Sequence, residues 1–96
     1  MAKLLEGRAA LVTGGGQGVG QGIARALAEA GANVMIAQRN IDQAEAEAAF
    51  LRDTHGGQAA AIRTDVSVEA ECEAMVKATH ERFGRLDILV NNAGGS

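Results

Sequence analysis

The chain has 96 residues, the size of one small domain, and its 47% hydrophobic and 22% charged residues are ordinary for a soluble globular protein. Its net charge of -3, the lack of a basic cluster and the scarcity of aromatic residues argue against nucleic-acid binding. No apolar run could span a bilayer, the N-terminus does not resemble a signal peptide, and the single cysteine fits a reducing compartment, so we expect no membrane partner and a cytoplasmic location.

The first predicted strand covers residues 8–13, a nearly continuous apolar run that suits a strand buried on both faces. From residue 19 the apolar spacing becomes helical, and Gly31 lies where a glycine commonly ends a helix. The side chains expected on the apolar face of this helix are Val19, Ile23, Leu27 and Ala30. The change of period predicts a buried strand followed directly by an amphipathic helix.

A glycine-rich segment, residues 13–20 (TGGGQGVG), joins this strand to the helix. Glycines let a dinucleotide pyrophosphate approach backbone N–H groups, and the helix N-terminus adds a partial positive charge. A flexible turn is the simpler interpretation, but the flanking strand and helix favour nucleotide binding. A P-loop is excluded because the segment continues Gly20-Gln21-Gly22, without a lysine. The residues predicted to bind the nucleotide here are Gly14, Gly16, Gln17, Gly18, Val19 and Gly20.

The second predicted strand covers residues 33–37 and is followed by Gln38 and Arg39. Asn40 is a good N-cap for the next helix, and Gln43 resembles the second member of a capping box. That helix is rich in Ala and Glu and ends before a pair of glycines. A methyltransferase site usually has an acid at the end of this strand, and Gln38-Arg39 does not supply one.

The third predicted strand, residues 58–63, is weaker because alanine is a poor strand former. Ser67 is expected to cap a third helix, which has an acidic first turn and ends at Gly84. The fourth predicted strand covers residues 86–90. The apolar stripe expected on the third helix consists of Val68, Cys72, Met75, Val76, Thr79 and Phe83.

Strands that alternate with helices over short connections predict right-handed crossovers and a parallel sheet. The expected fold class is therefore α/β: a partial Rossmann-type fold with three αβα layers and four strands in the order 3-2-1-4, forming one domain over residues 1–96. Ligands of such sheets bind beyond the carboxyl ends of the strands, at the point where the strand order reverses.

Thr13, Gly14, Gly18 and Gly20 form the pattern T-G-x-x-x-G-x-G, and residues 91–94 read N-N-A-G directly after the fourth predicted strand. On these motifs the chain resembles the short-chain dehydrogenase/reductase family. The resemblance covers nearly the whole chain but only the first part of the family's usual length, so we expect the domain to be truncated before the catalytic segment. 3-Oxoacyl-carrier-protein reductases are among the members that look similar.

The resemblance implies roles for two further segments. Asp65-Val66 follows the third predicted strand, where the family places an aspartate that contacts the adenine ring. In the N-N-A-G segment, Asn92 and Ala93 would line the cofactor channel, and Gly94 would belong to the turn that steadies the central sheet. A simple strand-ending turn is the alternative for this segment, because Asn and Gly both accept left-handed backbone angles.

The end of the second strand decides which nicotinamide cofactor is expected. An acid there accepts hydrogen bonds from the ribose hydroxyls of NAD, whereas an arginine accommodates the 2′-phosphate of NADP. Gln38 stands at the position that the family uses for the acid, and Arg39 follows it, so NADP is expected and NAD is less favoured. Alternatively, Arg39 only caps the strand or pairs with Asp42. Gln17 argues against NADP, because the family's NADP-binding members often carry a base there.

Hydride transfer in this family depends on a Tyr-x-x-x-Lys pair and a preceding Ser, in which the Tyr hydroxyl exchanges the proton. The chain has no Tyr, and its lysines, Lys3 and Lys77, lie before the first strand and on a helix flank. We therefore assign no catalytic residue and expect these 96 residues alone to be inactive.

The other reactive side chains are expected to be structural. His55 lies near a helix C-terminus, His80 on a solvated face, and Cys72 in the apolar stripe of its helix. No group of residues has metal-ligand spacing. The acids expected on solvated helix faces are Glu45, Glu47, Glu69, Glu71 and Glu73.

Two functions remain open, together with a less favoured third. The first is the cofactor-binding portion of an oxidoreductase that transfers a hydride between NADP(H) and a carbonyl or secondary alcohol. We expect the parent protein to be a homo-oligomer. The second is a non-catalytic fragment that binds nucleotide or associates with itself through an unpaired sheet edge. A Rossmann protein with other chemistry, such as a sugar-nucleotide epimerase, is disfavoured by the N-N-A-G segment.

Overall fold

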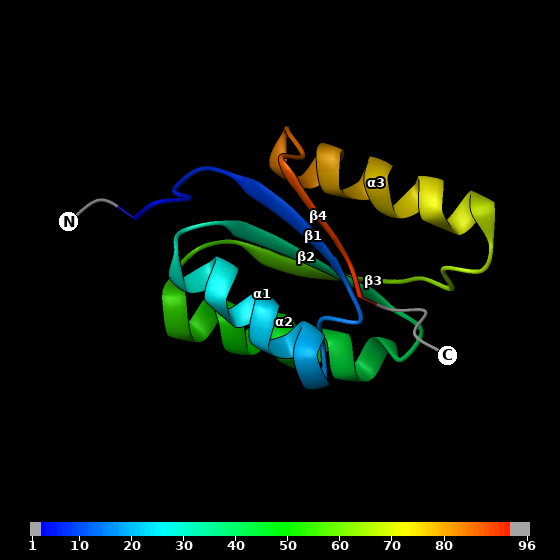
Figure 1. Ribbon diagram of the computed structural model, residues 1–96, viewed down its shortest axis with the longest axis horizontal. Helices are drawn as coiled ribbons and strands as arrows, with labels where there is room; N and C mark the ends of the chain where they lie inside the picture. Colours follow the sequence, from blue (N-terminus) through cyan, green and yellow to red (C-terminus); the bar gives the residue numbers. More distant parts are fainter. Residues whose placement is uncertain (1–2, 93–96) are drawn as a thin grey trace.

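The computed structural model describes residues 3–92, which form a four-stranded parallel sheet with the strand order β3-β2-β1-β4 (Figure 1). The order and the parallel pairing confirm the predicted partial Rossmann-type fold. Each strand boundary differs from its prediction by at most two residues. The elements are β1 (Ala9–Thr13), α1 (Gly18–Glu29), β2 (Asn33–Gln38), α2 (Ile41–His55), β3 (Ala59–Arg63), α3 (Glu69–Phe83) and β4 (Ile88–Asn91).

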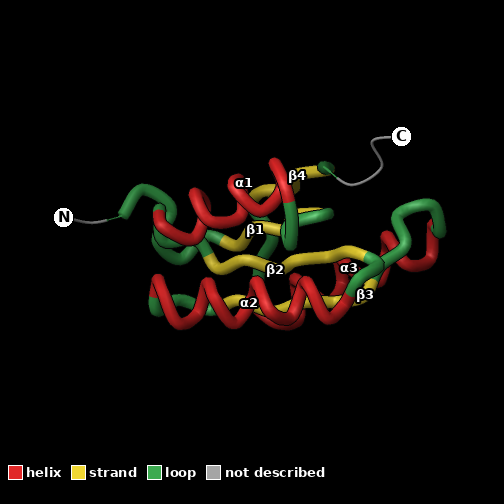
Figure 2. The backbone as a smooth tube through the Cα atoms, turned by 90° about the horizontal axis from the view of Figure 1, so that it is seen from below, coloured by secondary structure: helices red, strands yellow, loops and turns green. Residues whose placement is uncertain are grey.

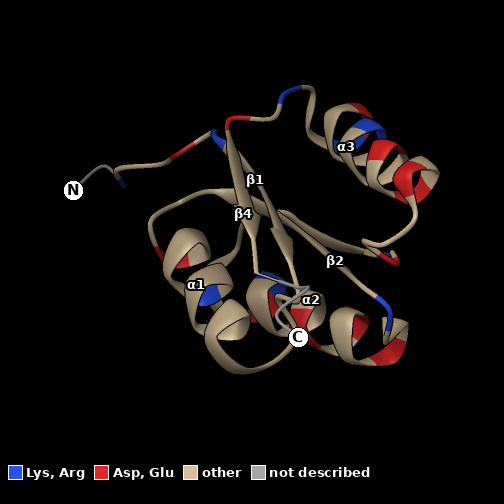
Figure 3. Ribbon diagram, turned by 45° about the vertical axis from the view of Figure 1, so that its right-hand side comes forward, with Lys and Arg blue, Asp and Glu red and all other residues tan. Residues whose placement is uncertain are grey.

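The helices form two layers around the sheet. Helices α1 and α2 cover one face and α3 covers the other, which confirms the predicted three αβα layers (Figures 1 and 2). Strands β1, β2 and β4 contain no charged residue and β3 has one, Arg63 at its end, so most charges lie on the helices and connecting segments (Figure 3). No helix within residues 3–92 is long and apolar enough to cross a membrane.

Alternation along the strands divides the core into two clusters. Val12 and Ile36 face α1 and α2, where they pack with Leu51, whereas Leu11 and Met35 face α3. All five residues of β1 are buried, because its side chains are covered on both faces. The apolar run at the start of the chain was therefore correctly interpreted as a strand buried on both sides.

The predicted apolar face of α1 was wrong at its first position. Val19 is 73% exposed, and the residues buried against the sheet are Gly20, Ala24 and Ala28. Small residues take these positions because the helix begins directly at the glycine segment and must lie close to the sheet there. Ile23 and Leu27 are half-buried beside this line.

The start and the apolar stripe of α3 also differ from the prediction. The N-cap is Val68, without a side-chain cap, while the Ser67 hydroxyl donates to Asp65 Oδ1 over 2.6 Å. The stripe is centred on Met75 and Thr79, and Val76 is 39% exposed. Thr79 can be buried there because its hydroxyl donates to the Met75 carbonyl oxygen over 2.8 Å.

Of the acids expected on solvated faces, Glu47 is buried and Glu71 is half-buried. Glu47 is 4% exposed on α2, because that face packs against α1 and Arg25 reaches across to it, with its Nε 2.8 Å from Glu47 Oε2. Glu71 is half-buried and accepts a hydrogen bond from the Asp65 backbone N–H over 2.8 Å. The spacing of apolar residues along each helix could not identify either contact, because each contact is made with a different segment of the chain.

Candidate functional site

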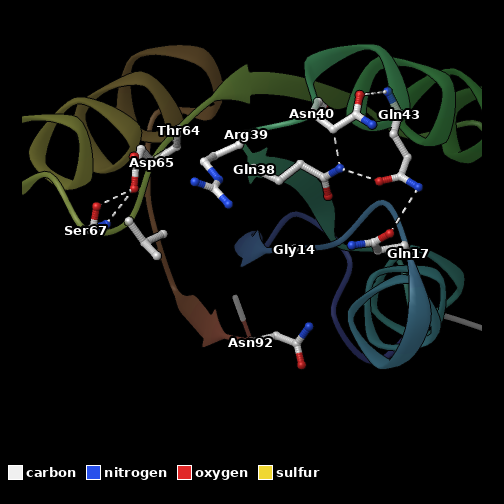
Figure 4. Close-up of a pocket in the computed structure, with 11 residues that line it drawn as sticks. Gly14, Gln17, Gln38, Arg39, Asn40, Gln43, Thr64, Asp65, Ser67 and Asn92 are labelled. Atoms are coloured by element: carbon white, nitrogen blue, oxygen red, sulfur yellow. Dashed lines mark hydrogen bonds between the residues drawn. The ribbon is translucent and has the colours of Figure 1, made fainter. Parts of the chain in front are cut away.

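A cavity of about 640 Å³ lies at the carboxyl ends of the strands, within the size range of small-molecule and cofactor sites (Figure 4). The connections after β1, β2, β3 and β4 all contribute to its wall. This is the position predicted from the reversal of strand order. Its lining residues are Gly14, Gln17, Gln38, Arg39, Asn40, Gln43, Thr64, Asp65, Val66, Ser67 and Asn92.

The glycine segment between β1 and α1 needs glycine for two different reasons. At Gly18, where α1 begins, φ is +57°, a left-handed value that other residues rarely adopt, and no atom lies within 4 Å of the place of a Cβ. At Gly20 a Cβ would collide with the Gly14 carbonyl and lie 2.6 Å from Asn92 Nδ2. The segment therefore has open space beside the helix N-terminus and close packing behind it.

Thr13 connects the glycine segment to the N-N-A-G segment. Its buried hydroxyl accepts a hydrogen bond from the Asn92 backbone N–H over 2.8 Å and lies 3.3 Å from the Val90 carbonyl and from Asn91 Oδ1. These contacts fix the ends of β1 and β4 relative to each other. The two motifs, which lie far apart in the sequence, thus form a single edge of the cavity.

Gln38 lies at the end of β2 with its side chain turned into the protein. It is 6% exposed, and its Oε1 accepts a hydrogen bond from the Gly16 N–H over 2.8 Å. Its Nε2 donates to the Asn40 carbonyl over 3.1 Å and to Gln43 Oε1 over 2.9 Å. A Cβ at Gly16 would lie 2.8 Å from the Gln38 amide, so a larger residue would require the Gln38 side chain to shift from its hydrogen bonds. Gln38 therefore ties the glycine segment to the start of α2.

Arg39 and Asp65 bring opposite charges to the cavity. Arg39 is exposed and forms no hydrogen bond or ion pair with any residue in the described range 3–92. The pairing with Asp42 considered from the sequence is therefore not formed. The pKa of Asp65 is held below its usual value by hydrogen bonds from the Ser67 hydroxyl and backbone N–H, and also by the charges of Arg39 and Arg63. The Asp65 carboxylate is thus already partly satisfied, whereas the Arg39 guanidinium is available.

The structure places the predicted site residues in three groups. Those that line the cavity are Gly14, Gln17, Arg39, Asp65, Val66 and Asn92. Those that belong to the glycine segment or to the first turn of α1 but do not line the cavity are Gly16, Gly18, Val19 and Gly20. Ala93 and Gly94 lie outside the described residues.

Five lining residues were not predicted as site residues: Gln38, Asn40, Gln43, Thr64 and Ser67. They follow β2 and β3, so the rule that ligands bind at carboxyl strand ends could have identified them as a group. Asn40 was predicted only as an N-cap, and this role is confirmed because its Oδ1 accepts from the Gln43 N–H over 3.1 Å. The Gln43 side chain does not complete a capping box but joins Gln38 and Gln17 instead.

The polar groups of the cavity suit an anionic nucleotide. The open backbone at Gly18 begins a helix, where unpaired N–H groups and the helix dipole favour phosphate. Arg39 adds a cation at the end of β2, Asp65 lies near it after β3, and Asn92 adds a polar side chain after β4. Within residues 3–92, no three His, Cys, Asp or Glu side chains are grouped so as to hold a metal ion.

Comparisons with known proteins agree with this geometry. The short chain dehydrogenase family matches residues 8–96. The short chain dehydrogenase/reductase astE of Aspergillus oryzae is 48% identical over 89 residues, which are 93% of this chain and 34% of that protein. None of the relatives named here is a 3-oxoacyl-carrier-protein reductase, so that narrower resemblance stays a prediction.

Two solved structures have the same arrangement of elements. The Pseudomonas aeruginosa RhlG/NADP active-site complex has a TM-score of 0.86 and 46% identity, and the match covers 99% of this chain and 38% of that chain. L-Sorbose reductase from Gluconobacter frateurii, complexed with NADPH and L-sorbose, has a TM-score of 0.91 and 33% identity, over 99% of this chain and 36% of that chain. The chain spans little more than a third of the length of these relatives. Since the family match covers nearly all of its residues, the chain belongs to the short chain dehydrogenase family.

Proposed function

We propose that this chain is the cofactor-binding portion of a cytoplasmic short-chain oxidoreductase and that it binds NADP(H) in preference to NAD(H). The observation that carries the proposal is the cavity at the carboxyl strand ends, which is lined by Arg39, an arginine with no hydrogen bond or ion pair to any of residues 3–92, and by the glycine segment that opens a helix. The complexes of the two structural relatives with NADP and NADPH support the same class of ligand.

Each part of the bound nucleotide has residues suited to it. The pyrophosphate would lie on backbone N–H groups between Gly14 and Gly20, where Gly18 leaves open space. Asp65 and Val66 would receive the adenine, and the N-N-A-G segment from Asn92 onward would line the path to the nicotinamide. When bound, the nicotinamide supplies or accepts the hydride.

Arg39 would recognise the 2′-phosphate that distinguishes NADP from NAD. A charge-assisted contact of this kind contributes about 1.5–3 kcal/mol, so Arg39→Ala should weaken NADP binding roughly 10- to 100-fold and leave NAD binding nearly unchanged. Titration calorimetry with both nucleotides measures this directly. Arg82→Ala, an exposed arginine on α3 away from the cavity, is the matched control. Equal affinities of the unsubstituted chain for the two nucleotides would refute the preference.

The reaction proposed for the parent protein is hydride transfer between NADP(H) and a carbonyl or secondary alcohol. A Tyr-x-x-x-Lys pair is needed to move the proton on the substrate oxygen, and these 96 residues contain no Tyr. We expect the pair to lie outside them and the chain alone to be inactive. Measurable oxidation of NADPH by this chain with a series of ketones would contradict that expectation.

The exposed edge of the sheet favours a second candidate function, self-association. β4 is an edge strand in the described part of the chain, and Leu89 on it is 54% exposed. Unpaired strand edges with apolar side chains readily pair with a second chain. Sedimentation should therefore show association that Leu89→Lys reduces, whereas Val19→Lys, at an exposed apolar residue away from the sheet edge, should not. A monomer at high concentration would refute this candidate.

A further inference from the structure

The carboxamide side chains of Gln38, Gln43 and Gln17 form a hydrogen-bonded line from the end of β2 to the rim of the cavity. Backbone groups at its first member determine which end of each amide is oxygen and which is nitrogen. The Gly16 N–H can only donate, so the atom of Gln38 that lies 2.8 Å from it must be oxygen. The Asn40 carbonyl can only accept, so the atom of Gln38 that lies 3.1 Å from it must be nitrogen. The orientation of the Gln38 amide is therefore determined by the main chain.

The orientation of the Gln38 amide determines the orientation of the next amide in the line. The Gln38 nitrogen also donates to Gln43 over 2.9 Å, so Gln43 must present its oxygen to Gln38 and its nitrogen outward. That nitrogen lies 3.3 Å from Gln17 and donates to its Oε1. Because the Gln17 oxygen is turned toward Gln43, the N–H groups are the part of the Gln17 amide that faces away from Gln43. Figure 4 shows the Gln17 nitrogen directed into the cavity, while its oxygen faces Gln43.

The line matters because it decides which end of the Gln17 amide a ligand meets. Without Gln43, the Gln17 amide could present either an oxygen or a nitrogen, and an oxygen would repel an anion. With Gln43 in place, the cavity has N–H donors on the Gln17 side and the Arg39 guanidinium at the end of β2. Both groups present hydrogen-bond donors, and one of them is a cation, which suits the acceptor oxygens of a phosphate better than a pair of neutral ribose hydroxyls.

We propose that Gln43 is a positioning residue for cofactor specificity: it holds the Gln17 carboxamide with its N–H groups toward the cavity and so favours a nucleotide that carries a phosphate on the adenosine ribose. Gln38, at the strand end where an acid would contact a ribose, is the fixed start of the line and not a ligand contact. The proposal rests on the proposed nucleotide binding. It explains how Gln17, a neutral residue, can support a preference for NADP.

The test compares the affinities of NADP and NAD, which differ only in the 2′-phosphate. Gln43→Met keeps the length of the side chain but removes its hydrogen bonds, and should reduce the preference for NADP about 3- to 10-fold through NADP binding alone. Gln43→Glu can only accept from Gln17, so it should turn the Gln17 oxygen toward the cavity and reduce the preference at least as much. Ala46→Glu adds the same charge at an exposed position one turn along α2 and is the matched control.

The double variant separates positioning from a structural role. In a Gln17→Ala background, Gln43→Met should cause no further loss of preference, and thermal unfolding should show that all variants remain folded. In the unsubstituted chain, the side-chain amide resonance of Gln17 should shift with NADP but not with NAD. An unchanged preference in Gln43→Met, or an equal loss with and without Gln17, would overturn the proposal while nucleotide binding stands. Absence of binding by the unsubstituted chain would overturn the proposed function as well.

Discussion

The two faces of the sheet are covered to different degrees. On the face covered by α1 and α2, the large side chains Ile36 and Leu51 are at most 1% exposed, and the buried Glu47 links the two helices through Arg25. On the face covered by α3, the helix contributes Met75 as its main apolar contact, and most of its other packed residues are only half-buried. The first face is a closed core, whereas the second is a partial one.

Most of the candidate site is built from segments next to the more fully covered face, the one on which α1 and α2 pack. The glycine segment joins β1 to α1, Gln38 ends β2, and Gln43 lies in the first turn of α2. A ligand site gains affinity when the groups around it are held before binding, because less ordering is then needed. β4 and α3, on the less covered side, contribute mainly Asn92 and the connection around Asp65.

Truncation of a core side chain on each face gives the largest expected effects. Leu51→Ala should lower the free energy of unfolding by about 2–5 kcal/mol, because the side chain is 1% exposed and its neighbours are close-packed. Met75→Ala should cost about 2 kcal/mol, at the lower end of the range, because the helix around it can adjust. Denaturant unfolding of both variants measures the difference, and a larger loss for Met75→Ala would reverse the comparison.

Substitution of the buried carboxylate of Glu47, on the face covered by α1 and α2, should have the next largest effect on the free energy of unfolding. Glu47 accepts hydrogen bonds from Gln21 over 3.0 Å and from Arg25 over 2.8 and 2.9 Å. Glu47→Gln keeps the shape of the side chain but removes the charge-assisted contacts, so the free energy of unfolding should fall by about 1–3 kcal/mol. Glu45→Gln, an exposed acid on the same helix, should change stability by less than about 0.5 kcal/mol. Equal effects of the two substitutions would show that the burial of Glu47 has no energetic consequence.

The smallest effect concerns the start of β4, on the less covered side. The pKa of Asp87 is lowered from 3.8 to about 2 by a hydrogen bond from the Arg85 guanidinium and another from the Ala9 N–H. A carboxylate with a lowered pKa in the folded state stabilises the fold above its unfolded pKa, and this contribution is lost as the pH falls from about 4 to about 2.

Asp87→Asn should therefore flatten the decline of stability over this range of pH. Unfolding followed at several values of pH between 2 and 6 measures it, and Asp53→Asn on the exposed side of α2 is the control. An unchanged pH dependence in Asp87→Asn would show that the contact does not hold the strand.

The sequence was sufficient to predict the sheet, because strand order follows from local patterns and chirality. The runs at β1, β2 and β4 are apolar enough to identify strands, and right-handed crossovers leave few possible orders. The carboxyl strand ends then located the cavity, and six of its lining residues were predicted from the glycine segment, the end of β2 and the family resemblance. Val19 was misplaced because its exposure depends on how α1 lies against the sheet, and Glu47 because its burial depends on how closely α1 and α2 approach each other. The role of Gln38 was missed for a similar reason, since its partners come from two separate connections.

The most direct test of the central claim is a map of backbone amide resonances of the ¹⁵N-labelled chain during titration with NADP. Binding of the pyrophosphate on the glycine segment should shift the signals of residues 14–20 and of Arg39, and leave the C-terminal turns of α3 unchanged. Absence of shifts at millimolar nucleotide, or shifts confined to α3 and β4, would contradict the account.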